Sequence, residues 1–201
     1  MLEFKNVSVS LSVHRQSTPF SLELDKGQVV SLSGPALSGK TLLLMAVLGL
    51  APLAAGYITI DGELLTPGSA AYFRRMIAYV PQQIPTDRIK VSHLFRSLLG
   101  LKAMTNEADT QRAFCVLEKR WQDIGLPPGI ANQWTPDVDP ETLRTAMLAA
   151  VPLLHRPIVL VDDPTPTDLT ARLLQHLADE GAEVLCASRS YNFPCHKTIT
   201  L

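Results

Sequence analysis

A glycine-rich stretch between a predicted strand and a predicted helix most constrains the fold of this chain. Gly34-Pro35-Ala36-Leu37-Ser38-Gly39-Lys40-Thr41 satisfies the pattern G-x-x-x-x-G-K-[ST]. Gln28–Ser33 before it is typical of a strand, and an apolar helical pattern follows Lys40. Glycines let the backbone curl until successive N–H groups face an anion, and the helix adds its positive end. The sequence therefore predicts a phosphate-binding loop (P-loop) at a strand-to-helix junction.

This loop assigns roles to individual side chains. Lys40 is expected to bridge the terminal phosphates of a nucleotide, and the Thr41 hydroxyl is expected to ligate Mg²⁺. The predicted nucleotide-binding residues are Gly34, Pro35, Ala36, Leu37, Ser38, Gly39, Lys40, Thr41 and Leu42.

A P-loop also needs a distant acid that helps to hold the metal. The apolar run Ile158–Val161 ends in Asp162, which fits this role. Asp163 follows directly and is placed to act on the attacking water. Because Asp-Asp-Pro commonly begins a turn, the alternative is that both carboxylates only cap local structure.

The length, net charge and cysteine content of the chain disfavour several classes of function. With 201 residues the chain is expected to form one domain. Lysine plus arginine is 18 and aspartate plus glutamate is 19, a net charge of −1, which disfavours nucleic acid as the main ligand. Cys115, Cys186 and Cys195 are odd in number and far apart, so neither disulfide partners nor a zinc site is indicated.

Alternating strand and helix patterns predict an α/β fold whose sheet is covered on both faces. Half-buried, antiparallel strands are expected at Val7–Val13 and Phe20–Leu24. The other expected strands are Gly56–Ile60 with an Asp61-Gly62 hairpin, Met76–Val80, Ile158–Val161, Glu183–Ala187 and Thr198–Leu201. Residues 69–75 and 167–179 are expected to be helical.

Residues 84–135 carry helical patterns and no strand signal. Val91–Leu101 and Glu107–Ile124 are the predicted helices there. A further helix is predicted to begin at Asp139-Pro140, with an N-cap carboxylate and proline at its first position, and to run through Leu154.

One segment imitates a membrane span. Thr41–Ile60 contains no charged residue, but Gly49, Pro52 and Gly56 interrupt it. A helix, a turn and a strand are therefore expected. The start of the chain also has no basic stretch followed by an apolar run, which argues against a secretory signal.

From Leu2 to Leu201 the chain resembles the ATP-binding cassette (ABC) family of ATPases. The resemblance rests on Gly27–Leu44 with the P-loop, on Gly56–Gly62, and on Arg74–Gln82, which looks like the glutamine loop of that family. It implies a mixed sheet flanked by helices, an N-terminal antiparallel β subdomain and an inserted helical subdomain. Residues 1–83 and 157–201 would form the nucleotide-binding core of one domain, and 84–156 the helical subdomain.

The resemblance also implies that Gln82 contacts the metal and the attacking water and relays nucleotide state to the helical subdomain. Thr41, Gln82 and Asp162 would then be the metal-site residues, and Asp163, Gln82 and Arg189 the catalytic ones. A solvated polar residue after a strand is the alternative for Gln82.

Three family motifs are altered here. Val138, Asp139, Pro140, Glu141 and Thr142 stand where the family has a signature of Leu-Ser-Gly-Gly-Gln type. Asp163 replaces the catalytic glutamate of the family, and Arg189 replaces its switch histidine, although Arg189 also fits a plain surface residue. No adenine-stacking aromatic residue is evident among Leu11, Val13 and His14.

The resemblance implies an ATP-binding subunit of an ABC transporter that uses ATP and Mg²⁺, with weak or partner-dependent hydrolysis. Its expected partners are an integral-membrane permease and a second nucleotide-binding subunit in a homo- or heterodimer, and its expected location is the cytoplasmic face of a membrane. The permease is expected to dock around residues 84–125. A non-hydrolysing regulatory module of the same fold and a small-molecule P-loop kinase are the alternatives.

Overall fold

The computed structural model describes residues 1–84, 87–100, 106–189 and 194–201. These residues form two compact units, Met1–Val80 with Arg156–Leu201, and Pro81–His155. We call them unit 1 and unit 2.

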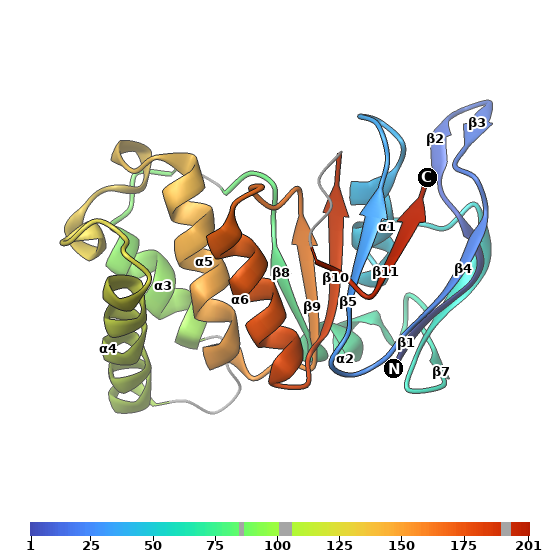
Figure 1. The fold of residues 1–201 in the computed structure, drawn as a ribbon. Helices are drawn as coiled ribbons and strands as arrows, with labels where there is room; N and C mark the ends of the chain where they lie inside the picture. Colours follow the sequence, from blue (N-terminus) through green and yellow to red (C-terminus); the bar gives the residue numbers. More distant parts are fainter. Residues whose placement is uncertain (85–86, 101–105, 190–193) are drawn as a thin grey trace. The chain divides into compact units, whose positions relative to one another are not determined.

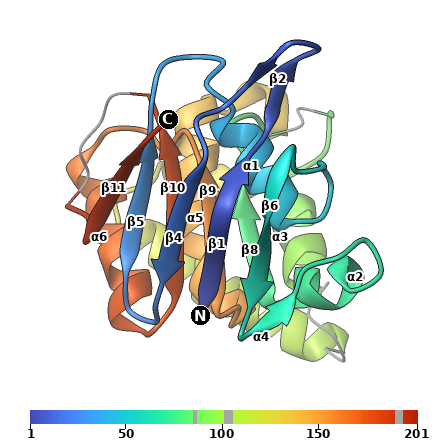
Figure 2. The same cartoon turned by 90° about the vertical axis from the view of Figure 1, so that its right-hand side faces the viewer.

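Unit 1 contains an antiparallel sheet near its N-terminus. Its strands lie in the order β4 (Phe20–Leu24), β1 (Leu2–Ser8), β6 (Ala55–Ile60) and β7 (Glu63–Leu64), all neighbours running antiparallel. Figure 2 looks onto β4, β1 and β6, with the parallel strands of unit 1 behind them. A separate two-stranded ribbon joins β2 (Ser10–Ser12) to β3 (Arg15–Gln16).

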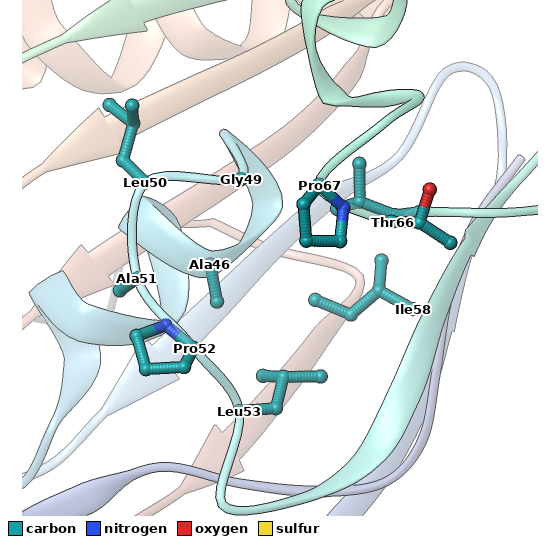
Figure 3. Close-up of a pocket in the computed structure, with 10 residues that line it drawn as sticks. Ala46, Gly49, Leu50, Ala51, Pro52, Leu53, Ile58, Thr66 and Pro67 are labelled. Atoms are coloured by element: carbon teal, nitrogen blue, oxygen red, sulfur yellow. The ribbon is translucent and has the colours of Figure 1, made fainter.

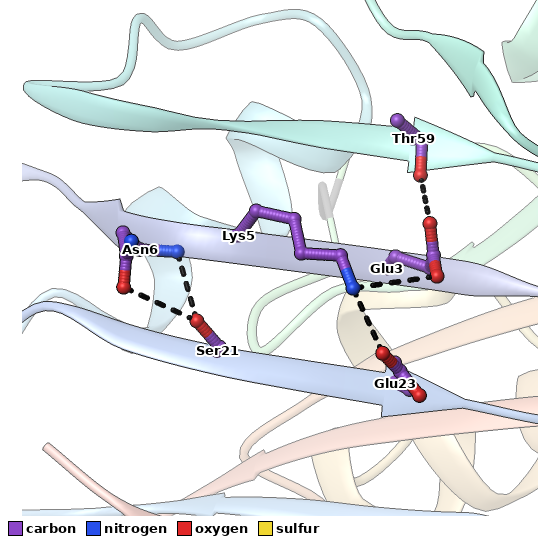
Figure 4. Close-up of polar contacts among 6 residues, drawn as sticks. All are labelled: Glu3, Lys5, Asn6, Ser21, Glu23 and Thr59. Atoms are coloured by element: carbon purple, nitrogen blue, oxygen red, sulfur yellow. Dashed lines mark hydrogen bonds and ion pairs between the residues drawn. The ribbon is translucent and has the colours of Figure 1, made fainter.

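The two faces of this sheet differ in polarity because side chains alternate along each strand. Leu2, Phe4, Leu22 and Leu24 are buried on the inner face. On the other face Lys5 bonds Glu23 at 2.8 Å and pairs with Glu3 at 3.6 Å, and the Thr59 hydroxyl donates to Glu3 (Figure 4). The outer face is therefore polar, as expected for a sheet with one solvated side.

A five-stranded parallel sheet forms the centre of unit 1. Its order is β11 (Lys197–Thr200), β5 (Val29–Ser33), β10 (Glu183–Ser188), β9 (Ile158–Asp162) and β8 (Ile77–Val80). Every residue of β9 and of β10 is buried. Since both faces of such strands are covered, their near-continuous apolar sequence follows.

Helices cover the two faces of the parallel sheet (Figure 1). α6 (Asp168–Asp179) buries Leu174, Leu177 and Ala178 and is capped by the Thr167 hydroxyl, which accepts from the Thr170 amide. α1 (Lys40–Val47) buries Leu43, Leu44 and Val47 in one core together with residues of both sheets. The first turn of α1 is therefore fixed from several sides.

Unit 2 is a helical unit of α3 (Val91–Gly100), α4 (Glu107–Asp123) and α5 (Pro140–Leu154), with two 3₁₀ turns, Ile130–Asn132 and Thr135–Asp137. The Trp121 ring meets Phe95 edge-on at 4.8 Å, and its indole N–H donates to the Ala146 carbonyl at 3.1 Å. A buried indole with its N–H satisfied stabilises such a core.

Most of the expected elements are present. The first strand expected in unit 1, Val7–Val13, has other bounds in the structure. β1 starts at Leu2, and β2 ends at Ser12. Val13, which we expected to be half-buried, is 92% exposed because the chain turns into the β2–β3 ribbon. The expectation for Val13 is wrong.

The expected helix over 69–75 is also shorter than predicted. It divides into α2 (Ala70–Phe73) and a 3₁₀ turn, Arg74–Met76, so that Met76 is not part of β8. The predicted end of the 91–101 helix at Leu101 lies outside the described residues.

The uncharged segment Thr41–Ile60 folds as α1, a turn and β6, as expected. Within the described ranges, no helix combines the length and the apolar character that crossing a bilayer requires.

Candidate functional site

The P-loop of unit 1 links the end of β5 to the start of α1. Gly39 precedes α1 with φ of 97°, a left-handed conformation that favours glycine. A β-carbon at Gly39 would lie 2.7 Å from Val9 Cγ2 and 2.8 Å from Leu11 Cδ2. This glycine therefore serves both the backbone turn and the close packing of the ribbon against the loop.

Lys40 is folded into this loop. Its ammonium donates to the carbonyls of Gly34 and Pro35, each at 2.7 Å, and to the Ser38 hydroxyl at 3.2 Å. The side chain is buried, so the loop holds a desolvated cation at its centre. A cation in this position is suited to bind phosphate oxygens.

Thr41 and Asp162 are 121 residues apart in sequence and meet in the structure. The Thr41 hydroxyl donates to Asp162 Oδ1 at 3.1 Å. Asp162 ends β9 and is buried, and its other oxygen accepts from the Tyr79 hydroxyl of β8 at 3.4 Å. The sheet order, with β9 beside β8 and β10, brings these groups to the carboxyl edge of the sheet.

Burial dominates the electrostatics of these groups. It raises the pKa of Asp162, against the hydrogen bonds from Thr41 and Tyr79. It also lowers the pKa of Lys40 and raises that of Tyr79. The charged forms of Asp162 and Lys40 are thus less stable here than in water, and a bound ligand of opposite charge would relieve that cost.

Asp163 and Arg189 form an ion pair at the same edge. Asp163 Oδ2 lies 3.2 Å from Arg189 Nε. The Asp163 amide donates to the Ala187 carbonyl at 2.7 Å, and Asp163 has φ of 48°, a conformation that aspartate tolerates better than most residues. Two residues far apart in sequence are therefore held together by neighbouring strands.

The donor atoms at Thr41 and Asp162 fit a magnesium ion. A hydroxyl and a carboxylate oxygen within 3.1 Å are hard ligands of the type that Mg²⁺ prefers, and Mg²⁺ takes its remaining ligands from water and phosphate. Among the described residues no group of three or more His, Cys, Asp or Glu side chains could hold a metal ion. Thr41 and Asp162 therefore fit a cation that takes its other ligands from water and phosphate.

Gln82 and the stretch 138–142 lie in unit 2. Arg144 Nη1 of α5 donates to the Gln82 carbonyl at 3.0 Å, which ties the Gln82 segment to that helix. Asp139 is the N-cap of α5, and its Oδ2 accepts from the Thr142 amide at 2.9 Å and from the Thr142 hydroxyl at 3.2 Å. The Asp139 carboxylate is therefore already hydrogen-bonded to the first turn of its own helix, α5.

A cavity of about 440 Å³ lies at the other end of α1 (Figure 3). The lining residues are apolar apart from Thr66 and carry no charge; they are Ala46, Gly49, Leu50, Ala51, Pro52, Leu53, Ile58, Leu65, Thr66 and Pro67. Because no cation lines it, this cavity does not suit phosphate.

The family model described as ABC transporter matches residues 17–166, more than half of the chain. The chain belongs to the ABC transporter family.

Two similar proteins in this family are named as ATP-binding proteins of metal transport. The manganese transport system ATP-binding protein MntB of Listeria innocua is 25% identical over 185 residues, covering 86% of this chain and 73% of the relative. The zinc import ATP-binding protein ZnuC of Jannaschia sp. is 27% identical over 191 residues, covering 93% and 70%.

Solved ABC structures share the fold. The dimeric structure of MJ0796, a bacterial ABC transporter cassette, has a TM-score of 0.80 at 24% identity and covers 100% of this chain and 94% of that one. A post-hydrolysis dimer of MJ0796 bound to ADP and Pi has a TM-score of 0.81 at 21% identity, with the same coverage. The ABC-type α/β fold expected from the sequence is confirmed.

Sequence reasoning missed Tyr79 as a partner of the site. An aromatic residue in a short apolar strand reads as packing, and only the adjacency of β8 and β9 shows that its hydroxyl reaches Asp162. Sequence reasoning also gave no sign that Asp163 and Arg189 contact each other.

Proposed function

We propose that this chain is a MgATP-binding subunit that couples its nucleotide state to a membrane permease. The observation that carries this proposal is the hydrogen bond between Thr41 and Asp162 beside the buried Lys40. It unites the two parts of a P-loop site that are 121 residues apart in the sequence.

Each group of the site has a role in this proposal. Lys40 binds the terminal phosphate oxygens, and the amides that begin α1 surround the phosphates. Thr41 and Asp162 hold Mg²⁺, which neutralises charge on the phosphates when bound. Gln82 is assigned to the metal and the attacking water, and Asp163 to orienting that water.

Hydrolysis is proposed to be weak or to depend on a partner subunit. By resemblance, the start of α5 would face the nucleotide held by a second subunit, and here it carries Asp139 and Glu141. Like charges oppose the approach of a phosphate. Asp163 is also shorter than glutamate by about one C–C bond, ~1.5 Å, and a misplacement of about 1 Å can lower a rate ~10²-fold.

Asp139 and Glu141 also favour a second candidate function. In it, the chain is a module that binds ATP without hydrolysing it and regulates by changing shape. The two candidates differ in phosphate release when every partner is present. Release under those conditions supports the transporter ATPase, and its absence supports the regulatory module.

The permease is the proposed membrane partner, with residues 84–125 of the helical segment as the proposed docking region, and a second nucleotide-binding subunit completes a dimer. The subunit then works on the cytoplasmic face of a membrane. The names of MntB and ZnuC, a manganese and a zinc transport protein, make divalent-cation import the first transport class to assay.

The binding test replaces the central cation of the loop. Lys40→Ala is expected to weaken MgATP affinity at least a hundredfold, because a charge-assisted phosphate contact is lost from a desolvated site. The measurement is isothermal titration with MgATP.

Lys26→Ala is the matched control, since Lys26 is exposed in the turn before β5. It should bind as tightly as the unchanged chain. Retained affinity in a folded Lys40→Ala protein would contradict the site.

A further inference from the structure

The two oxygens of the Asp162 carboxylate have different partners. The Thr41 hydroxyl donates to Oδ1 at 3.1 Å, and the Tyr79 hydroxyl donates to Oδ2 at 3.4 Å. Among the residues that the structure describes, Asp162 is the only hydrogen-bond partner of the Tyr79 hydroxyl. One oxygen therefore faces the other proposed metal-site residue, Thr41, and the second oxygen is held by a residue that has no role in the site so far.

Strand pairing directs Tyr79 to this carboxylate. β8 and β9 are parallel neighbours, and Tyr79 lies opposite Leu160. Because side chains alternate between the two faces of a sheet, Asp162, two residues after Leu160, lies on the same face as Tyr79.

Packing fixes the direction of the contact. The Tyr79 side chain is half-buried and packs against the core of unit 1. A phenol keeps its proton at neutral pH, so toward a carboxylate it acts as a donor. The distance of 3.4 Å is long for a hydroxyl donor, so the bond itself is weak, but the packed ring keeps the hydroxyl at Oδ2.

A carboxylate with one oxygen engaged distinguishes between divalent cations. Mg²⁺ is small and octahedral and keeps several of its waters, so one carboxylate oxygen is sufficient for it. Ca²⁺ takes about six to eight oxygen ligands and often binds both oxygens of a carboxylate. A hydrogen bond to Oδ2 weakens that oxygen as a metal ligand and restrains the rotation that two-oxygen binding would need.

We propose that Tyr79 makes the nucleotide site prefer Mg²⁺ to Ca²⁺ by holding Oδ2 of Asp162, so that the carboxylate offers a cation only Oδ1. The inference rests on the proposed MgATP site. Tyr79 is a positioning residue in it, because it acts on the cation through Asp162.

The first test compares affinities for a non-hydrolysable ATP analogue. Kd is measured by isothermal titration with Mg²⁺, with Ca²⁺ and in EDTA. Tyr79→Phe keeps the ring and removes only the hydroxyl, so Oδ2 becomes available. The preference for Mg²⁺, expressed as Kd with Ca²⁺ over Kd with Mg²⁺, is expected to fall about fivefold, the value for one weak hydrogen bond. Kd in EDTA should not change.

Tyr57→Phe is the matched control, since Tyr57 is a half-exposed tyrosine of β6 in the same unit. It should keep the preference of the unchanged chain. A purely structural role of Tyr79 would change all three Kd values by the same factor. That result, or an unchanged preference in a folded Tyr79→Phe protein, would overturn the proposal.

The second test uses the unchanged chain and does not depend on the folding of Tyr79→Phe. Tyrosine is labelled with ¹³C at Cζ, and the Tyr79 resonance is identified by substituting the other tyrosines. It should keep its metal-free position when the analogue binds with Mg²⁺ and shift when the analogue binds with Ca²⁺. A shift of the same size with both cations would contradict the proposal, because Mg²⁺ would then also displace Tyr79 from Oδ2.

The outcomes separate this inference from the function on which it rests. If Mg²⁺ does not strengthen binding of the analogue to the unchanged chain, the proposed MgATP site fails and the inference fails with it. If Mg²⁺ strengthens binding and Tyr79→Phe keeps the same cation preference, the site stands and only the role of Tyr79 is wrong.

Discussion

At the scale of single residues, Asp162 shows how a binding site is built at a cost to the empty protein. Asp162 is 4% exposed, and burial raises the pKa of its carboxyl despite the hydrogen bonds from Thr41 and Tyr79. The folded chain thus holds a proton at Asp162 more tightly than the unfolded chain does. The ionised carboxylate destabilises the folded state above the folded pKa, and the penalty disappears as the pH falls toward the ordinary value of 3.8.

Asp162→Asn should therefore stabilise the metal-free, nucleotide-free protein at pH 7. We expect a rise in Tm of about 2–4 °C, which corresponds to about 1 kcal/mol for a chain of this size. The gain should shrink as the pH is lowered toward 4. Thermal unfolding in EDTA at several pH values measures it.

Asp25→Asn, at an exposed carboxylate before β5, is the control and should leave Tm unchanged. A lower Tm for Asp162→Asn at pH 7 would contradict the assignment of burial as the dominant effect. With saturating MgATP the order should reverse, because the variant loses a ligand of the cation and so the stabilisation that bound nucleotide supplies.

Among single residues, the sequence predicted those whose chemistry depends on a local pattern along the chain. Lys40 and Thr41 follow from the glycine pattern, and Asp162 follows from the apolar strand that precedes it. Tyr79 and the contact between Asp163 and Arg189 could not be found this way, because they depend on which strands are neighbours in the sheet.

At the scale of elements, the start of α5 carries a strong local signal. The predicted N-cap, Asp139, accepts a hydrogen bond from the Thr142 amide at 2.9 Å, and Pro140 occupies the first helical position. Such a cap satisfies an amide that the helix itself leaves without a partner. This element was predictable because capping is a short-range effect.

Asp139→Ala is expected to lower the free energy of unfolding of unit 2 by about 1 kcal/mol. Asp139→Ser should retain most of it, since the serine hydroxyl also accepts from the Thr142 amide. Both tryptophans of the chain, Trp121 and Trp134, lie in unit 2, so urea unfolding followed by tryptophan fluorescence reports on this unit.

Asp137→Ala removes the same charge two residues earlier, in an exposed position of a 3₁₀ turn, and serves as the control. Equal losses for Asp137→Ala and Asp139→Ala would mean that net charge, and not the cap, explains the effect.

Elements with weak local signals were predicted less well. The two 3₁₀ turns of unit 2 and the division of 69–75 into a short helix and a 3₁₀ turn carry no periodicity of their own. Their ends are set by contacts distant in sequence, such as the Arg74 guanidinium donating to the Leu48 carbonyl at 3.0 Å.

At the scale of the whole molecule, the altered motifs predict a low rate of ATP hydrolysis. The purified chain with MgATP alone should hydrolyse far less than one ATP per second, below the ordinary enzyme range of about 1–10³ s⁻¹. The reason is that, in the proposed dimer, two copies of this chain would place Asp139 and Glu141 against both nucleotides. Phosphate release at several per second from the chain alone would contradict this.

The fold as a whole was predictable because its strongest signals agree with one another. The P-loop needs a strand before it and a helix after it, and the fully buried, largely apolar strands β9 and β10 require cover on both faces. The order of strands in the sheet, by contrast, depends on long-range pairing, and no local pattern encodes it.

The burial of β9 and β10 along their whole length has a consequence for cooperativity. Asp162 and Asp163 are attached to the end of β9, the kind of central strand that opens only when its whole folded unit does. Partial opening of unit 1 therefore leaves the two carboxylates in place. A substitution that weakens unit 1 far from the loop is therefore expected to reduce the amount of folded protein in a cell through degradation.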